Sequence, residues 1–177
     1  MRVVCLSLQG KRVVVLVDDL YQELEAWYPY YALRQAGAQT YFASYQNKQY
    51  SGKYGYPCTP QLTFKELKAQ EWDCVVIPGG YAPDKLRRYA EVNHFVKKMF
   101  DSGKVVAAIC HGLWVPISAG ILKGRKCTCF DGIKDDVANA GALYSDQEVV
   151  VDGNLVSSRK PDDLPAFCRE IARLLGK

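Results

Sequence analysis

The sequence predicts a three-layer α/β/α sandwich with an open, mostly parallel sheet and a nucleophile elbow. Apolar runs typical of strands buried on both faces alternate with amphipathic helical patterns along most of the chain. Two of these strands end abruptly, one at residues 78–80 and the other at 110–112. Because ligands of such folds bind outside the carboxyl ends of the strands, the loops after residues 17, 77 and 109 are the candidate site.

The first part of the chain predicts strand, helix and strand in turn. Residues 12–17 form an apolar run that ends at two aspartates. A helix should follow and end at Gly37, with a kink or a late start at Pro29. Its apolar residues recur at three- and four-residue spacing: Leu24, Trp27, Tyr28, Tyr31 and Leu33. A second strand is predicted over 39–44, and the aromatic, Gly/Pro-containing segment 46–62 indicates a hairpin or excursion at the sheet edge.

The second part continues the alternation. Residues 73–77 and 104–109 predict buried strands, separated by a helix with an apolar stripe over 92–100 that ends at Gly103. A helical stretch is expected from about residue 111 to 119. Residues 148–158 carry the pattern of a hairpin with a two-residue turn. The last helix should begin near 161–163, where proline and acidic residues favour an N-terminus.

Length and composition are those of one globular domain. The 177 residues are 49% hydrophobic and 24% charged, so we expect a single domain over 1–177, with 1–9 as an N-terminal extension. No apolar run reaches the 18–20 or so residues of a membrane span, and the N-terminus does not resemble a secretory signal. We therefore expect a cytoplasmic protein with no membrane partner.

Charge and cysteine usage argue against several kinds of site. The net charge of +4 is spread among interspersed acidic and basic residues, so no nucleic-acid partner is expected. Seven cysteines without a Cys-x-x-Cys pair favour reduced thiols and no metal, and Cys127 and Cys129 are expected to pack in the core. No Gly-x-Gly-x-x-Gly or phosphate-binding lysine motif is present, so no cofactor is predicted.

Cys110 is the most informative residue. It stands where a strand runs directly into a helix, with Ala108 two residues before it and Gly112 two residues after it. Small flanking residues permit the sharp turn that exposes a nucleophile, and a helix N-terminus favours the thiolate. In such an elbow the backbone N–H of His111 points toward a developing oxyanion. The alternative is an ordinary buried cysteine at a strand end.

The chain has two histidines, and only His111 is close to the nucleophile in sequence. Its ring could fold back across the elbow and act as a base, whereas His94 is expected on the surface. A cysteine–histidine pair also needs a third group that orients the imidazole. Asp84, at a probable helix start, is the candidate for that role, or else it compensates the helix dipole.

The other two strand ends supply a backbone donor and two acids. The N–H of Gly80 is a candidate second oxyanion donor. Glu23 is expected to face solvent in the first turn of its helix. Glu25 could reach the carboxyl edge of the sheet, where a functional role would require it to keep its proton and donate it to sulfur. The alternative for Glu25 is a helix-capping charge.

These residues occur within segments that resemble the ThiJ/PfpI superfamily, and within it the intracellular protease PfpI branch. The matching segments extend from about residue 12 to the C-terminus, and the cysteine motif after Pro-Gly-Gly is highly specific for this family. They are ELEAWYPYYAL, VVIPGGYAPDKLR, VVAAICHG, SAGILKGRKCT, GIKDDVANAGA and VVVDGNLVSSRKPDDLPAF.

The resemblance implies a flavodoxin-like, class I glutamine amidotransferase-like domain with Cys110 as nucleophile and His111 as its base. It further implies a protonated Glu25 hydrogen-bonded to sulfur and an oxyanion hole made by the amides of Gly80 and His111. The family's third triad member is a Glu from a neighbouring subunit, and here the matching position is Asp84, one methylene shorter. The site would thus be completed within a homodimer or hexamer.

The resemblance also limits the function to a few alternatives. The lead is a cysteine hydrolase that attacks a carbonyl carbon of a peptide, or of an aldehyde or glycated substrate as a glyoxalase or deglycase does. The alternative is a redox-sensing or chaperone protein that uses the same oxidisable cysteine. At Gln22 and Phe130 the sequence departs from Glu and Tyr of close relatives, which alters the polarity of the pocket.

Overall fold

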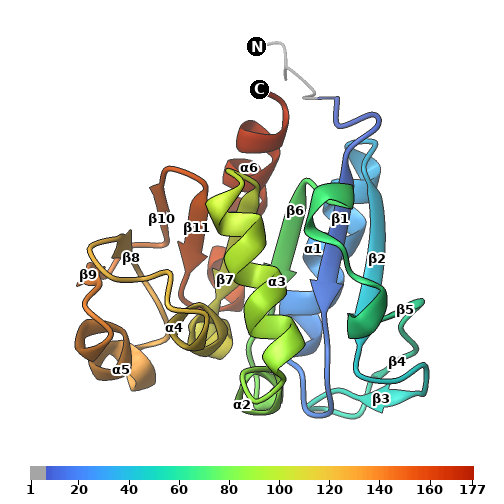
Figure 1. Cartoon of the computed structure of the whole chain (residues 1–177), viewed down its shortest axis with the longest axis horizontal. Helices are drawn as coiled ribbons and strands as arrows, with labels where there is room; N and C mark the ends of the chain where they lie inside the picture. The colour runs from blue at the N-terminus through green and yellow to red at the C-terminus, as the bar shows by residue number, and fades with distance from the viewer. Residues whose placement is uncertain (1–6) are drawn as a thin grey trace.

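The structure, a computed structural model, describes residues 7–177 and has a parallel sheet at its centre (Figure 1). In that part of the chain the main sheet has seven strands in the order β10-β11-β7-β6-β1-β2-β5. Neighbouring strands are parallel except for the antiparallel pair β10–β11. The strands are β1 Arg12–Leu16, β2 Gln39–Ser44, β5 Leu62–Thr63, β6 Cys74–Ile77, β7 Val105–Ile109, β10 Val149–Asp152 and β11 Leu155–Ser158.

Helices cover both faces of this sheet, which confirms the predicted three layers (Figure 1). Helices α1 (Glu23–Gln35) and α6 (Leu164–Leu175) contact each other on one face, and α3 (Ala90–Asp101) covers β6 and β7 on the other. The remaining helices are the short α2 (Ala82–Leu86), α4 (Trp114–Ser118) and α5 (Lys134–Asn139). The 3-10 turns are η1 Phe64–Glu66, η2 Ala69–Glu71, η3 Cys110–Leu113, η4 Asp131–Ile133 and η5 Pro161–Asp163.

The apolar stripe that predicts α1 does not mark the buried face of this helix. The helix begins at Glu23, before Pro29, and continues through the proline, so a late start is also wrong. Leu24, Tyr28 and Tyr31 of the apolar stripe lie on the exposed side, and the first of them is 57% exposed. The inward face instead carries Glu25, Ala26, Pro29, Tyr30 and Leu33. The inward face of α1 therefore includes a glutamate and excludes three of its large apolar side chains.

Segment 46–62 forms the predicted hairpin beside the sheet edge. Strands β3 (Tyr50–Ser51) and β4 (Pro57–Cys58) pair antiparallel, and a bridge joins Tyr21 to Gly52. The loop after β1 and the tip of this hairpin therefore lie side by side. A second small sheet, β8 (Lys126–Cys127) with β9 (Leu143–Tyr144), packs near β10 and β11.

The helix expected after Cys110 is broken into η3 and the short α4. Elsewhere the predicted elements are confirmed, including the β10–β11 hairpin and the helix after residue 163. Of the proposed N-terminal extension, residues 1–6 lie outside the described part. Leu8 is fully buried, and its N–H donates to the carbonyl oxygen of Ala36 at 2.8 Å.

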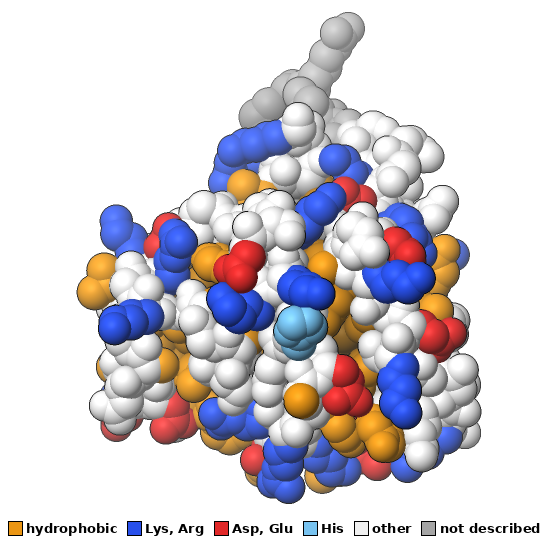
Figure 2. Space-filling model, viewed as in Figure 1, with side chains coloured by type: hydrophobic (Ala, Val, Ile, Leu, Met, Phe, Trp, Pro, Cys, Tyr) orange, Lys and Arg blue, Asp and Glu red, His pale blue; other side chains and the backbone are white. Residues whose placement is uncertain are grey.

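The surface carries both signs of charge in close mixture. On the face drawn in Figure 2, basic and acidic side chains are interspersed without a large patch of one sign. Among residues 7–177, no helix combines the length and the apolar character that a membrane crossing needs.

Candidate active site

Cys110 occupies a sharp turn directly after β7. Its φ of 61° lies in the left-handed region, which a residue with a side chain adopts only where its surroundings enforce it. Gly112 permits the turn, because a Cβ at that position would overlap the carbonyl oxygen of Ile77. The strand-to-turn geometry of a nucleophile elbow, predicted from the small residues around Cys110, is therefore present.

The ring of His111 folds back over the elbow, although the two residues are adjacent in the chain. Its Nδ1 lies 3.3 Å from Sγ of Cys110. The imidazole is held between the ring of Phe130, stacked at 4.9 Å, and the edge of Trp114 at 5.1 Å. Burial, and then the positive charge of Lys53, lower the pKa of His111 below its usual 6.5. The ring is therefore neutral at pH 7 and able to accept a proton.

Two backbone N–H groups, those of His111 and Gly80, point at Sγ. Gly80 has a φ of 78°, and a Cβ there would lie only 2.6 Å from the backbone nitrogen of Gln22. A bridge to Tyr21 holds this turn against the loop after β1. Glycine is thus required at position 80 by both conformation and space.

Glu25 lies completely buried beneath the elbow, on the inward face of α1. Its Oε2 accepts the N–H of Gly79 at 2.7 Å, while Oε1 is buried without a nitrogen or oxygen donor. The carboxyl group also hydrogen-bonds to the Cys110 thiol. Burial raises the pKa of Glu25 to about 8, against the smaller lowering effects of Gly79, Cys110 and Lys53. This pKa favours the protonated form of Glu25 at neutral pH.

The expected thiolate at Cys110 is not favoured by its environment. Burial, and then the negative charge of an ionised Glu25, raise the pKa of Cys110 to about 12, and the amides of His111 and Gly80 oppose this only in part. The helix dipole on which the expectation rested is weak here, because the elbow leads into a 3-10 turn and a helix of five residues. The neutral His111 ring is placed to take the proton when sulfur attacks.

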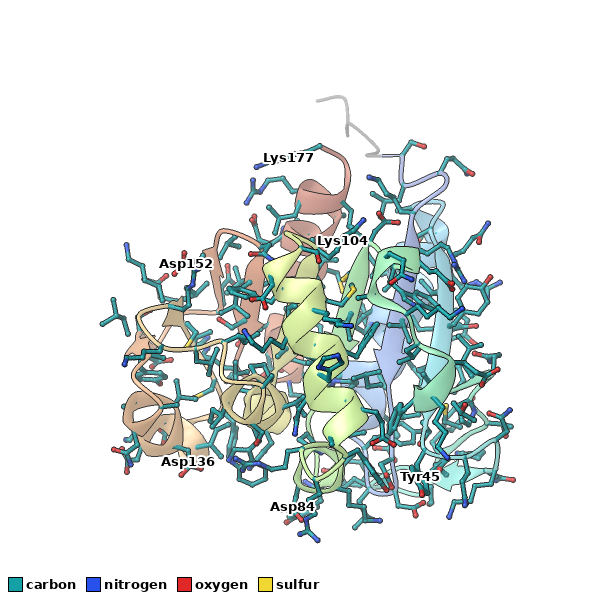
Figure 3. The ribbon with its side chains drawn as sticks, viewed as in Figure 1. Tyr45, Asp84, Lys104, Asp136, Asp152 and Lys177 are labelled. Carbon is teal, nitrogen blue, oxygen red and sulfur yellow. The ribbon has the colours of Figure 1, made fainter. Side chains whose placement is uncertain are left out.

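Asp84 does not reach His111 within the chain. It lies on α2 at the carboxyl end of the sheet, with its side chain on the outside of the molecule (Figure 3). The side chain is 48% exposed and forms an ion pair with Arg88, one turn further along. The structure thus brings Cys110, His111, Glu25 and Gly80 together and leaves Asp84 apart.

The elbow opens into a cavity of about 210 Å³, and Cys110, itself 7% exposed, forms part of its wall. Several lining residues were missed by the sequence analysis: Lys53, Tyr54, Tyr81, Lys160 and Pro161. Lys160 and Pro161 follow β11, which runs parallel to β7, so the rule about carboxyl strand ends applied to a fourth loop as well. Lys53 and Tyr54 come from the β3–β4 hairpin, and no sequence signal connected that hairpin to the site.

Glu23 is not the solvent-facing acid that was expected. Its Oε1 accepts the N–H of Tyr54 at 2.5 Å and that of Tyr56 at 3.4 Å, and its Oε2 is buried. A Cβ at Gly52 would overlap this carboxylate, so glycine makes room for it. Glu23 therefore fixes the tip of the β3–β4 hairpin over the mouth of the cavity.

The remaining cysteines of the described residues are buried and unpaired in disulfides. Cys127 and Cys129 are fully buried in the core, as predicted from their spacing. Across residues 7–177, no three side chains of His, Cys, Asp or Glu gather as a metal site would require.

Comparisons with known proteins agree on one family. The model of the DJ-1/PfpI family matches residues 11–174. The chain is 46% identical over 164 residues to Deglycase PfpI of Pyrococcus furiosus, covering 93% of this chain and 99% of that protein. It is 43% identical over 170 residues to protein/nucleic acid deglycase 2 of Escherichia coli, covering 94% and 99%.

A solved structure gives the same match in three dimensions. A two-domain protein of Anabaena variabilis with DJ-1/ThiJ/PfpI-like and ferritin-like domains superposes with a TM-score of 0.93 at 41% identity. The match covers 94% of this chain and 48% of that larger one.

Proposed function

Because the chain belongs to the DJ-1/PfpI family, we propose that it is a cysteine hydrolase acting on aldehydes or on their adducts with amines. In this proposal Cys110 is the nucleophile. One observation carries it: Nδ1 of His111 and the N–H groups of Gly80 and His111 all converge on Sγ of Cys110. Relatives named deglycases, 46% and 43% identical, support the choice of substrate class. The alternative proposal for the same site is that it hydrolyses peptides.

The first chemical step is common to both substrate classes. As Sγ bonds to the carbonyl carbon, the thiol proton passes to Nδ1 of His111 and the carbonyl electron pair moves onto oxygen. That oxygen accepts hydrogen bonds from the amides of Gly80 and His111, which are already oriented in a partly buried site. Glu25 keeps its proton and donates a hydrogen bond to sulfur, so no second negative charge forms beside the developing oxyanion. For an amide, the electron pair on oxygen re-forms the carbonyl, the C–N bond breaks and His111 returns its proton to the departing nitrogen. Water then hydrolyses the thioester on Cys110 to a carboxylic acid and the free thiol.

The direct test compares two cysteine substitutions. Cys110→Ser should abolish turnover of methylglyoxal, of methylglyoxal-treated peptides and of a fluorogenic peptide, with an unchanged circular dichroism spectrum. Cys168→Ser is the matched control, because Cys168 is also 7% exposed but lies on α6, outside the cavity. Full activity of the Cys110 variant would refute the proposal, and the substrate panel identifies which carbonyl the enzyme prefers.

We further propose that Asp84 of a neighbouring subunit orients His111. The exposed position of Asp84 supports this, as does the lack of any carboxylate hydrogen-bonded to His111 among residues 7–177. Asp84→Asn should lower kcat and shift the pH profile of the histidine. Asp101→Asn, which removes another exposed acid with an i,i+4 ion pair, should do neither.

Mixed oligomers test whether Asp84 acts between subunits. Inactive Cys110→Ser subunits and weakened Asp84→Asn subunits should regain activity when refolded together, because some sites then combine an intact Cys110 with an intact Asp84. No gain over the separate variants, or a monomer in solution by light scattering, would exclude the shared site.

A redox-sensing role is the second candidate, favoured by one feature. The protonated Glu25 carboxyl is buried in contact with the Cys110 thiol and can donate a hydrogen bond to an oxidised sulfur there. Oxidation to the sulfinate uses two peroxide molecules, each of which transfers one oxygen and leaves as water. Selective gain of two oxygens at Cys110 in mass spectrometry would support this role, and equal oxidation of several cysteines would count against it.

A further inference from the structure

Two lysines from separate parts of the chain line the cavity that holds Cys110. Lys53 comes from the β3–β4 hairpin and Lys160 from the turn after β11. Neither is needed for packing, since both side chains are exposed. Neither packing nor the chemistry of the elbow therefore accounts for two lysines in the cavity of Cys110.

The cavity holds no charge that cancels these lysines. At neutral pH the pKa values of Glu25 and Cys110 favour their protonated, uncharged forms, and that of His111 favours the neutral ring. Within residues 7–177, Lys53 has no carboxylate at ion-pair distance, and its Nζ lies 5.4 Å and 5.9 Å from the ring centres of Tyr54 and Tyr81.

Lys160 has only a weak partner. Its Nζ lies 3.4 Å from Asp162, whose side chain is 83% exposed and well solvated. Such surface pairs contribute little and exchange readily for a better ligand. The cavity therefore presents a net positive charge to whatever enters it.

The backbone at Lys53 is fixed in place. Its N–H donates to the carbonyl oxygen of Tyr21 at 2.8 Å, and the neighbouring N–H of Tyr54 donates to Glu23. The carboxylate of Glu23 thus accepts hydrogen bonds from the hairpin backbone and does not line the cavity. A lysine on a fixed backbone needs less ordering to meet a bound anion.

We propose that the cavity selects small carbonyl substrates that carry a carboxylate next to the reactive carbon, with Lys53 and Lys160 binding that carboxylate. This rests on the proposed function, since it names the substrate class of the same site. A volume of about 210 Å³ suits a substrate of a few heavy atoms, because pockets for larger ligands are roughly 300–1,000 Å³. The carboxylate stays with the lysines while the adjacent carbonyl faces Sγ.

Alkylation of Cys110 tests the proposal without requiring turnover. Iodoacetate and iodoacetamide have nearly the same size and the same leaving group, but only iodoacetate carries a carboxylate. The rate of each reaction at Cys110 is followed by peptide mass spectrometry, and the ratio of the two rates is compared with that of free cysteine. We expect the ratio to favour iodoacetate by roughly tenfold over free cysteine, and to fall as salt is added.

Single substitutions assign the effect to the lysines. Lys53→Gln and Lys160→Gln should each lower the ratio by roughly threefold. Lys48→Gln, which removes an exposed lysine of the same chain segment outside this cavity, should leave it unchanged. A ratio equal to that of free cysteine, no response to either lysine substitution, or no reaction of Cys110 with either reagent would each overturn the proposal.

Inhibition provides the second arm. Glyoxylate can add reversibly to Sγ of Cys110, but the adduct has no leaving group and no second carbonyl to accept a hydride, so it should inhibit and not turn over. Its inhibition constant against methylglyoxal turnover should be lower than that of acetaldehyde, which lacks the carboxylate, and this preference should be smaller in Lys53→Gln. If Cys110→Ser keeps its activity, the proposed function fails whatever the alkylation ratio. If activity depends on Cys110 but neither alkylation nor inhibition favours the anion, only the inference about the lysines fails.

Discussion

The protonated state of Glu25 has a measurable effect on stability, which Glu25→Gln isolates. The amide of glutamine preserves both contacts of the buried carboxyl: its oxygen can accept the N–H of Gly79, and its NH₂ can donate to Sγ of Cys110. The substitution therefore removes the ability to ionise with little change in shape. Any pH-dependent difference between the two proteins reports the ionisation of residue 25.

The sign and size follow from proton linkage. Burial raises the pKa of Glu25 from 4.5 to about 8 in the fold. As pH rises above about 4.5, the unfolded chain releases this proton while the folded protein retains it, so rising pH favours unfolding until the folded group titrates near 8. At about 1.4 kcal/mol per pKa unit, the native protein should lose about 3 kcal/mol of stability between pH 5 and 7.5 relative to Glu25→Gln.

Urea denaturation at pH 5 and at pH 7.5, at one fixed protein concentration, measures this difference. The unfolding free energy of Glu25→Gln should exceed that of the native protein by about 3 kcal/mol more at pH 7.5 than at pH 5. Glu148→Gln is the control, because Glu148 is exposed and its substitution likewise removes one carboxylate. Parallel pH dependence in the native and Glu25→Gln proteins would show that Glu25 is already ionised in the fold, and the reasoning about its proton would be wrong.

Two further predictions concern the same site. Gly79→Ala places a Cβ 2.6 Å from Oε2 of Glu25 and 2.7 Å from Cβ of Cys110, so it should cost about 1–3 kcal/mol in urea denaturation and reduce kcat more than tenfold. Because burial and Lys53 lower the pKa of His111, the acidic limb of the kcat/KM profile should have its midpoint below pH 6.5. Lys53→Gln should move that midpoint upward, and an unchanged midpoint would show that the lysine charge does not reach His111.

Much of this protein is determined locally, and those parts could be predicted from the sequence. The continuous apolar runs of β1, β6 and β7 are buried on both faces, and alternation with helices fixes a parallel sheet. The position of the elbow at Cys110 could also be predicted, because a strand runs directly into a helical segment there and small residues lie on either side of the cysteine. The return of His111 onto its neighbour's sulfur follows from the same turn.

Other features depend on which segments meet in space, and only the tertiary structure decided them. Whether Glu25 faces solvent or sulfur depends on the rotation of α1 against the sheet, and the apolar stripe of α1 indicated the wrong face. The protonation of Cys110 depends on burial by several elements, which outweighs the dipole of one short helix. Lys53 reaches the cavity through a hairpin that is distant in sequence from the elbow, because Glu23 holds the hairpin there. Periodicity and turn chemistry describe each segment alone, whereas burial and electrostatic potential are sums over all the segments that surround a group.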